Sequence, residues 1–164
     1  EEIADGVSRA ASELRWMLNL LREPDAEAQL AAASGSIAEA VQRADLRLNS
    51  QGFQLSSTLE GDPSRVPESV GSVVVLAIEE AVANLERHGS PDAPSGLILS
   101  VGEQALDLVV VNQVLEDSVD RAYGLGLVGV RERLVAIGGD FDARREGMQW
   151  LMQLHTPLVA GRSG

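Results

Sequence analysis

The residues most able to do chemistry lie on one predicted helix, in the segment IEEAVANLERHG at residues 78–89. Glu80, Asn84 and His88 follow one another at intervals of four residues, so a helix would place them on a single ridge. An amide oxygen can ligate Mg²⁺, and a carboxylate one turn away can orient or deprotonate a nucleophile. The same spacing also fits a plain amphipathic helix with a cationic end, because Arg87 and His88 suit the helix macrodipole.

A second candidate is the segment GLGLVGVRERL at residues 124–134, where Gly124, Gly126 and Gly129 form a G-x-G-x-x-G pattern. Glycines let the backbone approach a ligand, and the N–H groups at the start of a helix can bind phosphate. The chain contains no Lys, so Arg, His or backbone N–H groups must hold any anion. The pattern follows a polar loop instead of a strand, unlike a dinucleotide-binding fingerprint. A flexible loop with helix packing at Gly129 is the alternative.

The composition narrows the class of protein. The 164 residues carry a net charge of −12, which argues against a nucleic-acid partner. The absence of Cys excludes disulfides and thiolate chemistry and suits a reducing compartment. No apolar run approaches the roughly 20 residues that cross a bilayer, and we expect a cytoplasmic location. The chain begins with Glu-Glu and no Met, which predicts a piece of a longer protein.

Hydrophobic spacing and turn residues predict alternating helices and strands. The predicted helices cover 3–23, parts of 25–50 with a break at Ser34–Ser36, 67–88 and 125–137, and the predicted strands cover 53–61, 95–103, 105–112 and a final hairpin turning at 146–147. On the 67–88 helix we expect Ile78 and Leu85 to face the core, and Glu79 and Glu86 to point to solvent. Hairpins at the end favour an α+β sandwich, with helices on one face of a mixed, mostly antiparallel sheet.

Read together, the two segments resemble one family. IEEAVANLERHG resembles the N box of sensor histidine kinases of the nitrate-sensor or DesK-like class, E-A-x-x-N-x-x-[KR]-H-[AG]. YGLGLVGVRERLVAIGG (123–139) resembles the glycine signature of that class, and SELRWMLNLLRE (12–23) resembles the end of its second dimerisation helix. The resemblance implies a Bergerat-type fold of the GHKL superfamily, which binds ATP and Mg²⁺ between the long helix and a lid.

The resemblance also implies a role for each matching residue. Glu80 takes the position of the residue that polarises the phospho-accepting His, and Asn84 takes the position of the Mg²⁺ ligand. Arg87 and His88 match the pair on the phosphate side. The other matching positions that would contact ATP lie in the glycine segment: Gly124, Gly126 and Leu127.

Two departures from the family pattern stand out. Asn112 occupies the place of the adenine-reading Asp of the D box, and Val114 and Glu116 replace the glycines of D-x-G-x-G. A neutral amide can still accept the adenine amino proton, although more weakly than a carboxylate, and the larger side chains could crowd the base. The second departure is the missing phospho-acceptor, because His88 belongs to the N box and His155 to the last strand. The substrate His is therefore expected upstream in the full protein.

The resemblance, together with the predicted elements, indicates domain boundaries and a reaction for the chain. We expect the end of a dimerisation helix (1–24), a helical connector with the first domain helix (25–50), an ATP-binding catalytic domain (51–158) and a tail (159–164). The expected reaction transfers the ATP γ-phosphate to a His for relay to a response regulator, in a full-length homodimer. The alternatives are a degenerate, nucleotide-independent interaction module of the same fold, and an anti-sigma serine kinase, against which the dimerisation-like start argues.

Overall fold

The computed structural model of the chain describes residues 36–116 and 125–158. The predicted dimerisation helix, Gly124 and the predicted tail lie outside these residues. The described helices and strands follow one another in this order: α3 (Ile37–Ser50), β1 (Gln54–Glu60), the 3₁₀ helix η1 (Pro63–Arg65), α4 (Glu68–His88), β2 (Pro94–Val101), β3 (Ala105–Gln113), α5 (Leu125–Ala136), β4 (Asp140–Glu146) and β5 (Gln149–Pro157).

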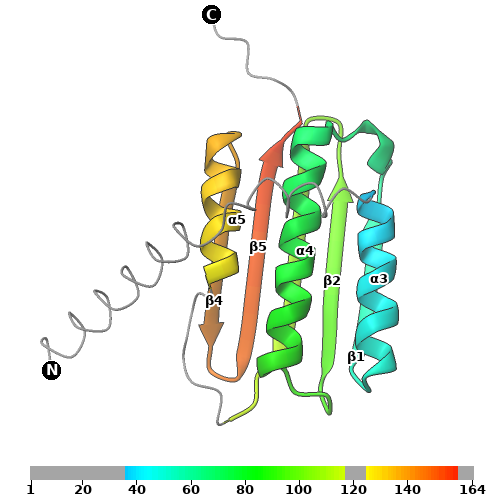
Figure 1. Cartoon of the computed structure of the whole chain (residues 1–164), viewed down its shortest axis with the longest axis vertical. Coiled ribbons are helices and arrows are strands. Elements are labelled where there is room, and N and C mark those ends of the chain that lie inside the picture. Colours follow the sequence, from blue (N-terminus) through cyan, green and yellow to red (C-terminus); the bar gives the residue numbers. More distant parts are fainter. Residues whose placement is uncertain (1–35, 117–124, 159–164) are drawn as a thin grey trace, which may run out of the picture. The chain divides into compact units, whose positions relative to one another are not determined.

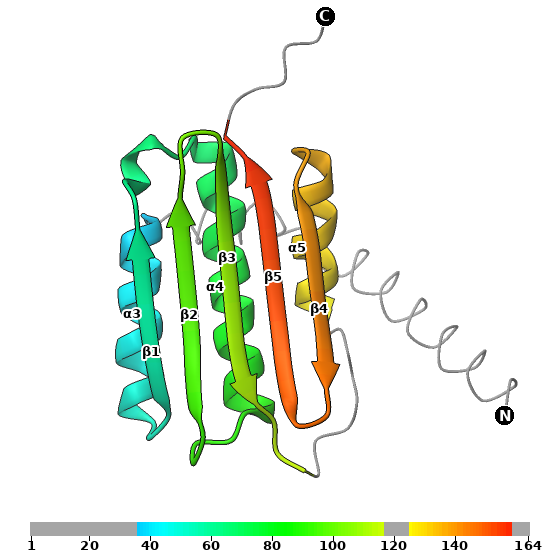
Figure 2. The ribbon, with the colours of Figure 1, turned by 180° about the vertical axis from the view of Figure 1, so that it is seen from behind.

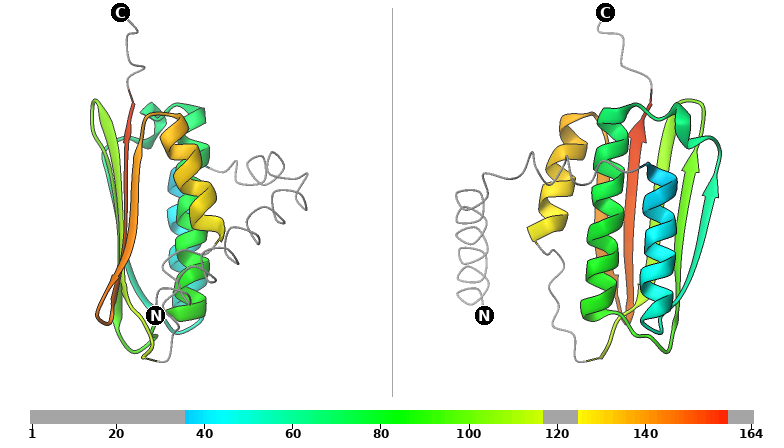
Figure 3. Two further views of the ribbon diagram at one scale, coloured as in Figure 1. Left: turned by 90° about the vertical axis from the view of Figure 1, so that its left-hand side faces the viewer. Right: turned by 45° about the vertical axis from the view of Figure 1, so that its right-hand side comes forward.

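The strands form one sheet in the order β1-β2-β3-β5-β4. β1 runs parallel to β2, and the other neighbouring pairs are antiparallel. The three helices α3, α4 and α5 cover one face of this sheet (Figure 1), and no helix in the described ranges lies over the other face (Figure 2). Seen edge-on, the strands and the helices form two layers (Figure 3). The predicted α+β fold, with a mixed and mostly antiparallel sheet under helices, is confirmed.

The helix boundaries follow from local chemistry. Ser36, inside the predicted break, is the N-cap of α3 and forms a capping box with Glu39. The Glu39 N–H donates to the Ser36 Oγ at 3.1 Å, and the Ser36 N–H donates to the Glu39 carboxylate at 3.3 Å. α4 begins after Pro67, whose backbone is already extended, and it carries Arg87 and His88 in its last turn.

The core lies between the sheet and the three helices α3, α4 and α5. It is built mainly from Val, Leu, Ile and Ala, as the scarcity of aromatic residues predicts. The inward alternation predicted for the last strand is also confirmed, because Trp150, Met152 and Leu154 are all buried. Among the described residues, no helix is both long enough and apolar enough to span a bilayer.

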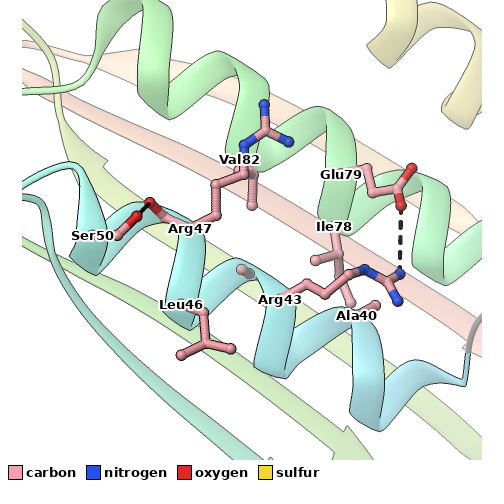
Figure 4. Close-up of a pocket in the computed structure, with 9 residues that line it drawn as sticks. Ala40, Arg43, Leu46, Arg47, Ser50, Ile78, Glu79 and Val82 are labelled. Atoms are coloured by element: carbon pink, nitrogen blue, oxygen red, sulfur yellow. Dashed lines mark hydrogen bonds and ion pairs between the residues drawn. The ribbon is translucent and has the colours of Figure 1, made fainter.

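The expectation about the solvent side of α4 is confirmed for Glu79, which is exposed, and wrong for Glu86. Glu79 pairs with an Arg of α3, and Glu86 pairs with α3 and with the turn that follows it. Arg43 reaches Glu79 at 3.5 Å (Figure 4), and Glu86 accepts hydrogen bonds from Arg47 at 2.8 Å and from Gln51 at 2.9 Å. The side chain of Glu86 is only 18% exposed. Helical spacing shows which way a side chain points, but it cannot show that a second helix packs alongside.

Candidate active site

α4 places the predicted acid, amide and imidazole on one ridge. Glu80, Asn84 and His88 are all partly exposed, beside the fully buried face of the helix. Arg87 is exposed, and its Nε donates a hydrogen bond to the Ala83 carbonyl at 3.2 Å. The guanidinium therefore stays close to its own helix, where its charge also acts on Glu80. The ridge and the neighbouring Arg87 thus bring a carboxylate, an amide, an imidazole and a guanidinium to one side of α4.

The carboxylate of Glu80 lies against the backbone of Gly126, in the first turn of α5. A Cβ atom placed on residue 126 would collide with both carboxylate oxygens of Glu80. Only a glycine leaves room for this approach. The N-box segment and the glycine segment, which are far apart in the sequence, thus meet at one point. In the sequence, the G-x-G-x-x-G pattern marked this position.

This position changes the acidity of Glu80. Burial raises the pKa of its carboxyl above the ordinary value, the positive charge of Arg87 opposes the rise, and Glu79 adds to it. A carboxylate with a raised pKa holds a proton more readily than an exposed one. Such a group suits a hydrogen-bond acceptor or general base acting on an incoming nucleophile.

Asn112 lies near the end of β3, opposite Trp150 of β5, and is only 3% exposed. Its side-chain amide donates one hydrogen bond, from Nδ2 to the Gln113 carbonyl at 3.1 Å. Its Oδ1 is buried and has no partner among the described residues. A buried acceptor without a donor costs roughly 1–3 kcal/mol, so this oxygen is suited to a ligand that donates a hydrogen bond.

The segment after Asn112 is tied to the end of α4. The Ser90 N–H donates to the Gln113 carbonyl at 2.8 Å, and the Leu115 N–H donates to the His88 carbonyl at 2.9 Å. Val114 is buried, and its N–H donates to the Met148 carbonyl at 2.8 Å. These backbone hydrogen bonds, which the sequence analysis did not predict, hold Asn112 close to the C-terminal end of the ridge.

For the remaining predicted site residues within the described ranges, the structure shows no side chain that takes part in the contacts described above. Leu127 is buried in the core, so only its backbone, in the first turn of α5, is available to a ligand. Glu116 is exposed, and Gly124 lies outside the described residues. In the part of the chain that the structure describes, no group of three or more His, Asp or Glu side chains could hold a metal ion.

Comparisons with known proteins point to one group. No protein-family profile matches the chain. A curated relative, the sensor histidine kinase LnrJ of Bacillus subtilis, is 27% identical over 97 residues, which cover 58% of this chain and 24% of the relative. The chain thus spans about a quarter of that protein's length.

Solved structures with a similar fold are also histidine kinases. The histidine kinase domain of the blue-light activated histidine kinase of Erythrobacter litoralis has a TM-score of 0.58 and 17% identity, over 72% of this chain and 57% of that chain. The Acinetobacter baumannii histidine kinase AdeS has a TM-score of 0.52 and 15% identity, over 98% of this chain and 86% of that chain. The chain therefore has a Bergerat-type α/β sandwich fold, which it shares with these histidine kinase structures.

Proposed function

We propose that this chain carries the ATP-binding catalytic domain of a sensor histidine kinase of the nitrate-sensor or DesK-like class. It would transfer the γ-phosphoryl group of ATP to a His outside the described residues, on the dimerisation domain of the same protein. The observation that carries the proposal is the contact between the Glu80 carboxylate and Gly126. It joins the two segments that resemble this class, on a fold shared with histidine kinases.

Asn112 supports the base end of the proposed ATP site. Its Oδ1 is buried and unpartnered among the described residues, so it can accept a hydrogen bond from the exocyclic amino group of adenine. The acceptor is neutral, whereas the family has a carboxylate, so we propose a degenerate D box and weaker base recognition.

Asn84 supports the metal end. Among the described residues, no group of three or more His, Asp or Glu side chains is placed to hold a metal ion, so Mg²⁺ would be held by the Asn84 amide oxygen together with phosphate oxygens. Bound there, the ion would neutralise charge on the phosphate chain during transfer. Arg87 and His88, one turn further along, would bind the phosphates, with Gly124, Gly126 and Leu127 supplying backbone on the other side.

Glu80 would act on the substrate His. By accepting a hydrogen bond from one ring nitrogen, its carboxylate would fix the tautomer in which the other nitrogen carries the lone pair. That nitrogen forms the new bond to phosphorus while the bond between the β- and γ-phosphates breaks and ADP leaves. The raised pKa of Glu80 makes it a stronger acceptor for this proton.

The proposed setting follows from the same class. The phosphoryl group would pass to a response regulator, and the full-length protein would be a homodimer in the cytoplasm or at its membrane surface. Nucleic acid would not be a partner, since the chain has a net charge of −12.

Calorimetric titration with ATP and with ADP, with and without Mg²⁺, tests this function. We expect Mg²⁺-dependent binding that Asn84→Ala abolishes. Gln42→Ala, which removes an exposed amide from α3, is the matched control and should bind as the unchanged protein does. Absence of binding heat with either nucleotide, on protein shown to be folded, would overturn the proposal.

A second candidate function is a nucleotide-independent interaction module. It is favoured by Val114, which is buried and paired with Met148 where the family has a glycine. In that case the double change Asn112→Asp and Val114→Gly should create or strengthen ATP binding in a chain that otherwise ignores nucleotide. If the double change leaves ATP binding unaltered, the lost glycines do not explain the difference.

A further inference from the structure

The face of the sheet opposite the helices carries exposed apolar residues as well as polar ones. Figure 2 shows that none of the described helices lies over this face, and the strand register gives the residues that share it. In a solvent-facing sheet surface one expects polar residues at alternating positions. Here the central strands place apolar residues at several of those positions.

The apolar residues form one continuous strip. Ile98 lies directly opposite Val109, and Val111 lies directly opposite Leu151. Val109 and Val111 are two residues apart on the same strand, so the two pairs adjoin. Ile98 is 49% exposed, and the other three are partly exposed. The strip therefore runs over β2, β3 and β5 and is open to a partner.

Carboxylates border this strip. One row across the sheet contains Glu60, Ser100, Asp107, His155 and Asp140, in that order over the five strands. Each of its three acids is exposed, and the Asp107 Oδ1 lies 2.7 Å from the His155 Nδ1.

The edge strand β4 adds two more acids to this face, Asp142 and Glu146. Both pair with Arg144, the one Arg that the described strands place there, at 2.5 and 2.7 Å. The positive charge of Arg144 is thus compensated within the face. A hollow of 390 Å³ is lined by several of these open-face residues, Asp107, Val109, Gln153 and His155 among them, and by residues of β4 and α5.

We propose that this open face is a docking surface for a basic, apolar segment of a partner protein. The strip would bury the apolar side chains of that segment, and the carboxylates around it would pair with Lys or Arg. Charge selects this occupant over a second copy of the chain, because two such faces would bring acidic rows together. The proposal is independent of ATP binding, since none of these residues belongs to the proposed nucleotide site.

The test uses two synthetic amphipathic peptides, one of leucine and lysine and one of leucine and glutamate. Each is titrated into the full chain while backbone amide NMR shifts are recorded. We expect the lysine peptide to shift amides of residues 96–100, 107–111 and 151–155, and the glutamate peptide to shift none of them. The variants Ile98→Thr/Val111→Thr and Asp107→Asn/Asp140→Asn should each weaken binding by about tenfold or more.

The matched control is Glu68→Gln/Glu132→Gln, which removes the same charge from exposed positions on the helical side. It should bind the lysine peptide within about twofold of the unchanged chain. Thermal unfolding of each variant confirms that it is folded. Shifts spread over the helices, or equal weakening in the acid pair and the control pair, would overturn the proposal. A chain dimer that is lost in Ile98→Thr/Val111→Thr would also overturn it, in favour of self-association.

Discussion

At the scale of single residues, the position of Glu80 in the fold affects both its proposed role and the stability of the protein. Its carboxylate is partly buried against Gly126, and burial raises its pKa. A group whose pKa is raised on folding binds more protons in the folded state than in the unfolded state. Its contribution to stability is thus fully present below its ordinary pKa of 4.5 and is lost as the pH rises through the raised value. At neutral pH the ionised carboxylate opposes folding.

Glu80→Gln should therefore stabilise the protein at pH 7, because the neutral amide avoids the desolvation of a charge. The gain should shrink as the pH is lowered toward 4.5 and vanish below it. The midpoint of thermal unfolding at several pH values measures this. Glu132→Gln, the same change at an exposed site on α5, is the control. A Glu80→Gln variant that is less stable at pH 7, or equally shifted at every pH, would contradict the described environment.

At the scale of elements, α5 is docked on α4 through Gly126, whereas Gly129 has a different neighbour. A Cβ atom on residue 126 would strike the Glu80 carboxylate, but one on residue 129 would only meet the Arg133 guanidinium at 3.1 Å. Both colliding groups are ends of flexible side chains, so the fold should tolerate both changes. The two changes differ in the group that they displace: a Cβ at residue 126 displaces the Glu80 carboxylate, whereas a Cβ at residue 129 displaces the Arg133 guanidinium.

Gly126→Ala should move the Glu80 carboxylate and lower phosphotransfer in the full-length protein by about tenfold or more. Gly129→Ala, the control, should raise stability by about 0.5–1 kcal/mol through helix propensity and leave transfer nearly unchanged. In a Glu80→Ala background, Gly126→Ala should show the same stabilising effect as Gly129→Ala. Urea unfolding and phosphotransfer assays give both readouts. If Gly126→Ala keeps full activity, the contact has no functional weight.

The elements themselves could be predicted from the sequence because their signals are local. The apolar spacing of α4, the turn at 102–103 and the alternation in β5 each occupy a few consecutive residues, and all are confirmed. The pairing of Glu86 with α3 and of Val114 with Met148 joins distant segments and leaves no local pattern. The burial of the Asn112 Oδ1, which has no partner within residues 36–116 and 125–158, likewise depends on three-dimensional packing. The proposed roles of the site residues come from the family resemblance, whereas their contacts and burial come from the structure.

At the scale of the whole molecule, the net charge of −12 acts on stability as well as on partners. Most of the ion pairs that the structure describes join well-exposed side chains, the pair of Arg47 with Glu86 being the exception, so most contribute little, whereas like-charge repulsion acts over the entire surface. Raising NaCl to about 1 M, where the screening length is about 3 Å, should therefore raise the unfolding temperature. Thermal unfolding in NaCl series tests this, and a falling midpoint would show that the ion pairs outweigh the repulsion.

The most direct test of the account is a residue-by-residue map of backbone amide NMR shifts on adding Mg²⁺ and ATP to the full chain. We predict amide shift changes in three separate segments, residues 80–88, 112–116 and 125–127, and no shift changes on the open face of the sheet. The same additions to Asn84→Ala should produce none of these changes. Saturating nucleotide that leaves all three segments unshifted, or shifts confined to the open face, would contradict an ATP site between α4, α5 and the end of β3.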